Sequence, residues 1–119
     1  MLLKVLRAKI HRAVVTETAV DYVGSITIDP DLADAVGIVQ GESVLVADLA
    51  NGTRHETYVI YGDRGSGTVC INGAAARLVE VGDRIIIMAF AYVTPQEAQK
   101  LTPSIVLVDE SNRVARKLS

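Results

Sequence analysis

Residues 38–46 read IVQGESVLV and residues 79–87 read VEVGDRIII, so their apolar, glycine and acidic positions coincide at a constant offset of 41 residues. In each copy a short helical stretch leads into a Gly-acid turn and then into an apolar strand. Such turns are common before strands, and a chance match stays open as an alternative. Two related halves predict one closed β-barrel, which would also explain how so many strands avoid exposed edges.

Runs of apolar and β-branched residues continue on both sides of these two copies. They predict a mainly β protein with short helices, organised as a single domain over residues 1–119. The expected strands are 2–15, 25–29, 43–49, 54–61, 68–71, 84–93 and 104–108, and the expected helical segments are 30–37, 73–78 and one that opens near 94–95. The Asn51-Gly52 pair predicts a hairpin turn. The mostly polar residues 110–119 are expected to be frayed.

Composition limits the classes of function that this chain can have. Hydrophobic residues make up 50% of it and the mean hydropathy is +0.31, which is more apolar surface than one small core needs and favours oligomerisation. The net charge is −2 with scattered Lys and Arg, so we expect no nucleic-acid partner. No apolar run approaches the roughly 20 residues of a membrane span, and the first residues lack the apolar core of a leader. We therefore expect a cytoplasmic protein without a membrane partner.

Cysteine and histidine are too few for several kinds of site. Cys70 is the single cysteine, so it cannot form an internal disulfide, and with only two histidines no zinc constellation is available. We expect no metal. Because Cys70 lies in an apolar, strand-like run, its expected role is that of a buried small hydrophobe.

The Gly24-Ser25 bond is the one place where the sequence suggests that the chain could cleave itself. A serine hydroxyl can attack the preceding carbonyl and turn the amide into an ester. Elimination and hydrolysis then leave a ketone-bearing pyruvoyl group at a new N-terminus. Glycine before the serine leaves the carbonyl unshielded and tolerates strained backbone angles. A Gly-Ser pair more often only turns the chain, and the pair alone does not decide between these interpretations.

Other segments of the chain help to choose between these two interpretations. Polar or small residues interrupt ordinary strand patterns at 22–25, 54–58 and 72–76. Together with Lys9-Ile10-His11-Arg12, Asn51-Gly52-x-Arg54, Arg64-Gly65-Ser66 and Val81-Gly82-Asp83, this ordered set resembles the pyruvoyl-dependent aspartate 1-decarboxylase family over almost the whole chain. The resemblance implies a six-stranded double-psi β-barrel, a homotetramer with sites at subunit interfaces, and decarboxylation of L-aspartate to β-alanine for pantothenate synthesis. It also implies that Ile26, where some members have cysteine, has no required role.

The same resemblance implies the cofactor and how it arises. The chain would cleave itself between Gly24 and Ser25, giving a β chain of residues 1–24 and an α chain of residues 25–119. The pyruvoyl group derived from Ser25 would form a Schiff base with the substrate and act as electron sink, without pyridoxal phosphate.

Roles for individual residues follow from the resemblance as well. Tyr58 is the expected proton donor, and Thr57 and Asn72 are expected to assist self-processing. The expected substrate-binding residues are Arg54, Lys9, Gly73, Ala74 and Ala75, and His11 and Tyr22 are secondary candidates. If the strand is regular, Thr57 and Tyr58 point to opposite faces, so they would need a bulge or act in different steps.

Two alternatives stay open on the sequence. One is a non-enzymatic β-barrel module that dimerises to bind DNA or a protein, which predicts no cleavage. The other is a pyruvoyl decarboxylase of a different amino acid, although two cations, Arg54 and Lys9, favour a dicarboxylate.

Overall fold

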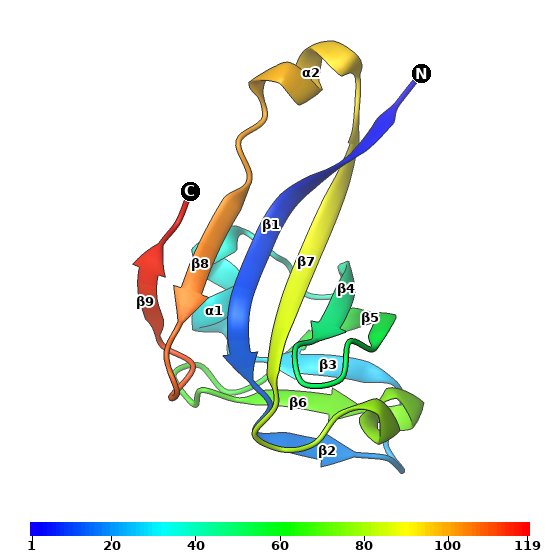
Figure 1. The fold of residues 1–119 in the computed structure, drawn as a ribbon, viewed down its shortest axis with the longest axis vertical. Helices are drawn as coiled ribbons and strands as arrows, with labels where there is room; N and C mark the ends of the chain where they lie inside the picture. The colour runs from blue at the N-terminus through cyan, green and yellow to red at the C-terminus, as the bar shows by residue number, and fades with distance from the viewer.

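The computed structural model describes all 119 residues and is mainly β, with two short α-helices and one 3-10 helix (Figure 1). The strands are β1 (Leu3–Val14), β2 (Glu17–Ala19), β3 (Ser25–Ile28), β4 (Ser43–Asp48), β5 (Arg54–Tyr61), β6 (Val69–Asn72), β7 (Arg84–Val93), β8 (Ser104–Val108) and β9 (Val114–Lys117). The helices are α1 (Pro30–Val36), the 3-10 helix η1 (Gly73–Leu78) and α2 (Pro95–Lys100). None of the helices has the length and apolar composition needed to cross a bilayer.

All nine strands belong to one continuous sheet, in the order β2-β6-β3-β5-β4-β7-β1-β8-β9. β1 and β7 form a long antiparallel ribbon whose far end carries α2, and β2, β3 and β6 lie across its other end (Figure 1). Ile26, Val46 and Ile87 are among 22 buried residues that form the core. Buried residues alternate with partly buried ones along Arg84–Ala89 of β7, as a sheet with one face towards the core requires.

The sequence repeat of residues 38–46 and 79–87 is also a structural repeat. Gly41 and Gly82 both have positive φ, and their N–H groups donate to the carbonyls of Val59 and Val15 respectively. In both copies the following acid closes the turn with its side chain, Glu42 onto Val39 N–H and Asp83 onto Glu80 N–H. The positive φ explains why both copies need glycine at this position.

Strand register relates the two copies by an approximate two-fold axis. In the antiparallel β4–β7 pair Val46 lies opposite Ile87, and in the β3–β6 pair Ile28 lies opposite Val69. Both pairs join residues 41 positions apart, the same offset as in the sequence. Each copy therefore contributes equivalent strands to two central ladders, and the prediction of two related halves is confirmed.

Buried Asp29 ties α1 to the loop before β6. Its carboxylate caps α1 through Asp31 N–H and accepts from Gly65 and Gly67 N–H. Burial alone would raise the pKa of Asp29, but these three donors and Arg113 lower it overall. α1 ends at Gly37, in left-handed conformation, as the sequence predicts.

The prediction of a frayed C-terminal segment is wrong. Val114–Lys117 form β9, which pairs antiparallel with β8. Asn112 is buried. Its side-chain oxygen accepts from the backbone N–H of Val14, and its side-chain nitrogen donates to the carbonyl oxygens of Val14 and Gly67. The side-chain amide of Asn112 thus anchors the polar C-terminal segment, which has no periodicity in its sequence.

Two further predictions need adjustment. β2 was not expected, because three residues give too short a pattern to recognise. The Asn51-Gly52 hairpin is confirmed, but β4 ends at Asp48, so the loop of residues 49–53 is one residue longer than expected. The other expected strands and helices are confirmed, with bounds that are identical or differ by one residue at one or both ends.

Candidate active site

The sheet order brings three remote parts of the predicted site together. β3 begins at Ser25 and lies between β6, which ends at Asn72, and β5, which contains Thr57 and Tyr58. Ser25 is directly opposite Asn72 in the antiparallel β3–β6 ladder. Ile26 is paired with Val59 on the other side, so Ser25 and Tyr58, one residue earlier on these parallel strands, are neighbours. The serine is thus flanked by two of its predicted partners.

Ser25 is buried and hydrogen-bonded. Its side chain is 1% exposed, and its Oγ accepts from Asn72 Nδ2 at 2.8 Å. The same amide nitrogen donates to Thr27 Oγ1 at 3.0 Å, while Asn72 Oδ1 accepts from Cys70 Sγ at 3.2 Å. These four side chains occupy one face of the β3–β6 pair because Thr27 is opposite Cys70, two residues from the Ser25–Asn72 pair.

Gly73 packs directly against the backbone at Gly24. A Cβ on Gly73 would lie 2.6 Å from Gly24 Cα and 3.2 Å from the carbonyl oxygen of Tyr22, and Gly73 has φ +78°. Gly24 differs: its own Cβ position is open, with nothing within 4 Å, and its φ is not positive. The position that requires glycine is therefore Gly73, whereas Gly24 has neither a positive φ nor a crowded Cβ position.

Thr57 and Tyr58 occupy opposite faces of β5. The β4–β5 ladder has no register shift, and Thr57 is opposite Val44, which faces the core. Tyr58 is 41% exposed on the outer face that also holds Ser25. No bulge turns Thr57 to that face, so Tyr58 shares the face of Ser25 and Thr57 does not.

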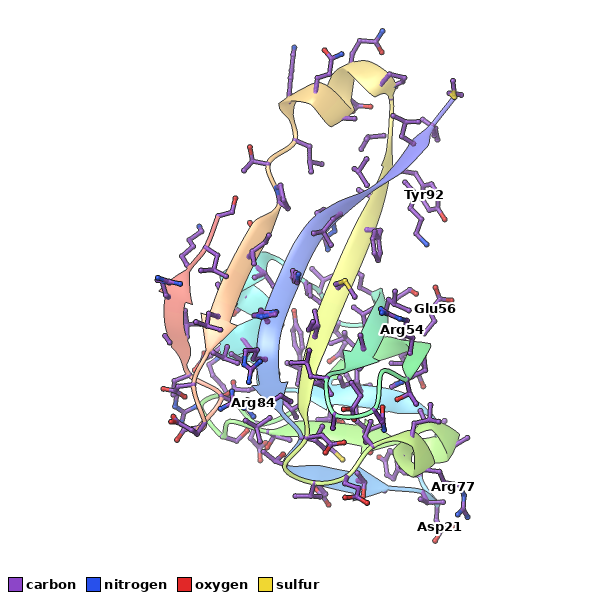
Figure 2. All side chains as sticks on the ribbon, viewed as in Figure 1. Asp21, Arg54, Glu56, Arg77, Arg84 and Tyr92 are labelled. Atoms are coloured by element: carbon purple, nitrogen blue, oxygen red, sulfur yellow. The ribbon has the colours of Figure 1, made fainter.

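The outer face of the sheet also carries the predicted cations. Arg54 is opposite Ala47, Ala47 opposite Ile86, and Ile86 opposite His11. In the neighbouring row Lys9 is opposite Met88, Met88 opposite Leu45, and Leu45 opposite Glu56. Figure 2 shows Arg54 and Glu56 on the exposed side of β5.

Neither Arg54 nor Lys9 makes a salt bridge or a side-chain hydrogen bond within the chain. Their strands, β5 and β1, are three steps apart in the sheet, a backbone separation of about 14 Å at ordinary strand spacing. The two cations therefore lie on one face of the sheet, on strands that are not neighbours. Desolvation, and then the charges of Lys9 and Arg12, lower the pKa of His11, whose Nδ1 is buried without a partner.

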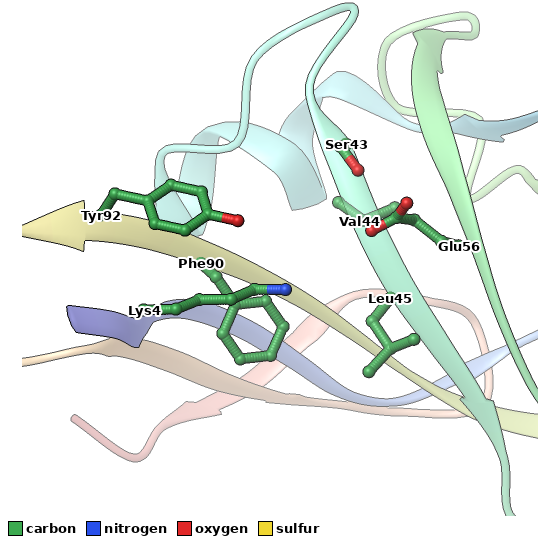
Figure 3. Close-up of a pocket in the computed structure, with 7 residues that line it drawn as sticks. All are labelled: Lys4, Ser43, Val44, Leu45, Glu56, Phe90 and Tyr92. Atoms are coloured by element: carbon green, nitrogen blue, oxygen red, sulfur yellow. The ribbon is translucent and has the colours of Figure 1, made fainter. Parts of the chain in front are cut away.

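Two pockets open on this face. One, of about 190 Å³, is lined by Lys4, Ser43, Val44, Leu45, Glu56, Phe90 and Tyr92. There the Lys4 ammonium lies 4.9 Å from the centre of the Phe90 ring, with Glu56 across the pocket (Figure 3). It contains none of the predicted site residues. The other, of about 230 Å³, is lined by Glu17, Ala19, Tyr22, Thr27, Ile60, Thr68, Cys70 and Asn72. It adjoins the Ser25 hydrogen bonds.

Sequence reasoning missed Thr27 and Cys70 as neighbours of the site. Cys70 is buried, as expected, but it is also a hydrogen-bond donor. The available signal was strand alternation: Cys70 and Asn72, and Ser25 and Thr27, are each two residues apart and so share a face.

The residues around Ser25 are compatible with a pyruvoyl group made from that serine. The Oγ has a donor at 2.8 Å, and glycine at 73 leaves the close approach to Gly24 that any Cβ would block. Ala74 and Ala75 follow at the start of η1, where small side chains leave backbone N–H groups accessible.

Fold and site together define a mainly β protein that presents a buried, hydrogen-bonded serine directly after an exposed glycine. Comparison with known proteins narrows this class. The sequence model of the aspartate decarboxylase family matches residues 1–115.

Individual relatives agree over nearly the full length. The chain is 56% identical over 116 residues to aspartate 1-decarboxylase of Caldicellulosiruptor saccharolyticus, covering 98% of this chain and 91% of the relative. It is 54% identical over 117 residues to the Ruminiclostridium cellulolyticum enzyme of the same name, with the same two coverages. With the Corynebacterium efficiens enzyme it shares 55% identity over 114 residues, 96% of this chain and 84% of the relative. The chain belongs to the aspartate decarboxylase family.

Proposed function

We propose that this protein decarboxylates L-aspartate to β-alanine and CO₂, the step that supplies β-alanine for pantothenate synthesis, with a pyruvoyl group made from its own Ser25. Identity above 50% to aspartate 1-decarboxylases along almost the whole chain carries the assignment of the reaction. The Asn72–Ser25 hydrogen bond at the Gly24-Ser25 junction supports the assignment of the cofactor.

Self-processing begins with attack of Ser25 Oγ on the carbonyl carbon of Gly24. The bond from that carbon to the Ser25 nitrogen breaks, an ester forms, and the hydroxyl proton ends on the freed amine. Elimination releases the Gly24 carboxylate, and hydrolysis consumes one water and releases ammonia, leaving the ketone at residue 25. Asn72 Nδ2, already directed at Oγ, supplies a fixed dipole where charge develops. We assign Thr57 to this stage on the family resemblance, although its side chain lies on the core side of β5 and Ser25 lies on the other face.

Once formed, the pyruvoyl group supplies the electron sink that loss of CO₂ from an amino acid requires. Arg54 binds a substrate carboxylate with its unpaired guanidinium, which suits a bidentate contact. Tyr58, exposed on the same face as residue 25, returns a proton to the α-carbon. The backbone N–H groups of Gly73, Ala74 and Ala75 receive the other carboxylate. Tyr22 and His11 stay secondary candidates, because Tyr22 is 62% exposed and His11 lies three strands from Arg54.

The arrangement of cations supports an oligomer. Lys9 and Arg54 have no acidic partner within the chain. Apolar Leu45, Ile86 and Met88 are partly exposed between them. A homotetramer in which Lys9 of one subunit completes the site of another satisfies both observations. We place this enzyme in the cytoplasm, where its free thiol, Cys70, would stay reduced.

We also propose that the sheet is a six-stranded double-psi barrel. Thr16, which follows β1, donates its N–H to the carbonyl of Val69 in β6 at 2.8 Å. The continuous segment β1–β2 is thus bonded to β7 along its first part and to β6 along its second. Closure through this segment would join the strands in the order β1/β2, β7, β4, β5, β3 and β6.

The reaction is tested by incubating purified protein with L-aspartate and measuring β-alanine and CO₂. Wild type is expected to form both, and Ser25→Ala to form neither. L-Glutamate and L-alanine serve as competing substrates, and a preference for either over aspartate would replace the assignment with a decarboxylase of another amino acid. Decarboxylation retained by Ser25→Ala would contradict the pyruvoyl mechanism.

A further inference from the structure

We infer that Cys70 is a positioning residue for self-processing: its thiol holds the oxygen of the Asn72 amide, so that the amide nitrogen faces Ser25 Oγ. The inference deepens the proposed function and rests on it for its kinetic consequence. The hydrogen bond itself can be tested whether or not the chain cleaves.

The hydrogen-bond partners of Asn72 make its orientation depend on the thiol. Hydroxyl groups both donate and accept, so Ser25 and Thr27 could bond either end of the amide. If the amide were reversed, its oxygen would face the two hydroxyls and its nitrogen would face the Cys70 sulfur, a weak acceptor. Cys70 Sγ lies 3.2 Å from Asn72 Oδ1 and breaks this symmetry as a donor.

Reversal would change what Asn72 can do. With nitrogen towards Ser25, at 2.8 Å, the amide supplies a donor to an oxygen that takes part in acyl transfer. With oxygen towards Ser25, it would only accept the hydroxyl proton. Cys70 therefore selects the orientation in which Asn72 can stabilise developing negative charge.

The environment keeps the thiol in its donor form. Cys70 is 6% exposed and Asn72 is 5% exposed, so water has little access to the bond. Burial, and then the charge of Glu17, raise the pKa of the Cys70 thiol, which keeps it protonated at neutral pH. Glu17 lies beside Cys70 in the parallel β2–β6 ladder. A protonated thiol is what the hydrogen bond to Asn72 Oδ1 requires.

The kinetic test follows self-cleavage in three variants. Precursor is synthesised in a cell-free system in the cold and warmed, and the cleaved fraction is followed by intact-mass analysis. Cys70→Ala and Cys70→Val remove the donor, and the second keeps a branched apolar side chain. Both are expected to cleave about three- to tenfold more slowly than wild type. Cys70→Ser keeps a donor and is expected to restore most of the rate. Thermal unfolding is measured in parallel to separate slow cleavage from instability.

A second measurement observes the bond directly. Because the chain has a single cysteine, its S–H stretching band in the infrared reports on one group. The band is expected at the low frequency of a hydrogen-bonded thiol and to rise in Asn72→Leu, while an exposed substitution such as Asp63→Asn leaves it unchanged.

The outcomes separate the two proposals. A wild-type chain that never cleaves contradicts the proposed self-processing, while the infrared band still decides whether Cys70 holds Asn72. If wild type cleaves and Cys70→Val cleaves equally fast, the positioning role is overturned and the proposed function stands. A thiol band that does not respond to Asn72→Leu overturns the role as well.

Discussion

At the scale of single residues, two glycines near the proposed cleavage point have unequal roles. Gly73 has positive φ and no space for a Cβ beside Gly24, whereas Gly24 has open space at its own Cβ position. Gly24 precedes the serine in the sequence, but the tightly packed glycine is Gly73, at the end of the neighbouring strand β6. Substitution by alanine distinguishes the two.

Gly73→Ala is expected to lower the free energy of unfolding by about 1–3 kcal/mol, because it combines left-handed strain with the clash at Gly24. Gly24→Ala is expected to change it by less than about 1 kcal/mol. Urea unfolding measures both, with each substitution made in a Ser25→Ala background so that the chain stays whole. Equal effects of the two substitutions would contradict the geometry at Gly73.

Arg54 is expected to be needed for turnover of aspartate but not for self-cleavage. It is exposed, on the outer face of β5 and four residues before Tyr58, and makes no ion pair that folding would lose. Arg54→Ala is expected to cleave normally but to lose at least about 100-fold in kcat/KM for aspartate, since a bidentate carboxylate contact is removed. Arg77→Ala, another exposed arginine, is the matched control. Failure of Arg54→Ala to cleave would show that its role is misassigned.

At the scale of elements, the β4–β5 hairpin and the turn before β7 meet at two carboxyl groups. Asp48 is 3% exposed; its Oδ1 accepts from Ala50 N–H, and its Oδ2 is buried without a partner among the ordinary donors of the chain. Burial raises the pKa of Asp48, and the hydrogen bond to Asp83 and its charge add to the rise. The same hydrogen bond lowers the pKa of Asp83. Opposite pKa shifts of this kind are expected when Asp48 holds a proton that it shares with Asp83.

This sharing gives stability a defined pH dependence. Because the folded-state pKa of Asp48 is raised, its contribution is full below the unfolded value near 4 and is lost as pH rises through the folded value. Asp48→Asn supplies a permanent donor to Asp83, and we expect it to stabilise by about 1 kcal/mol at pH 8 and by less at pH 4.5. Thermal unfolding at both values tests this, with exposed Asp63→Asn as control. A stabilisation independent of pH would contradict the shared proton.

How much of this could be predicted from sequence differs between elements. The repeat, the long strands and the segments that carry Ser25, Tyr58 and Asn72 were predictable, because periodicity and turn residues are local signals. The roles of Cys70 and Thr27 were not, since they arise from the pairing of strands that are remote in sequence. Asn112 was missed for the same reason: its hydrogen bonds to Val14 span 98 residues.

At the scale of the whole molecule, the proposed site shared between subunits predicts that activity requires two chains. Lys9→Ala and Arg54→Ala are each expected to be nearly inactive alone. When the two are co-expressed and assemble together, about a quarter of randomly formed sites combine both wild-type side chains. Activity should rise accordingly in the mixed oligomer. If mixing restores none, while light scattering shows that the chains co-assemble, both cations act within one chain.

The central claim is that the sheet places Ser25 against Asn72 so that the chain cleaves itself before Ser25. Intact-mass analysis of purified protein tests it most directly. We predict two fragments, residues 1–24 and 25–119, the larger without the amine of an N-terminal serine, and a single whole chain for Ser25→Ala. A wild-type chain that stays whole under every maturation condition and makes no β-alanine from aspartate would contradict it.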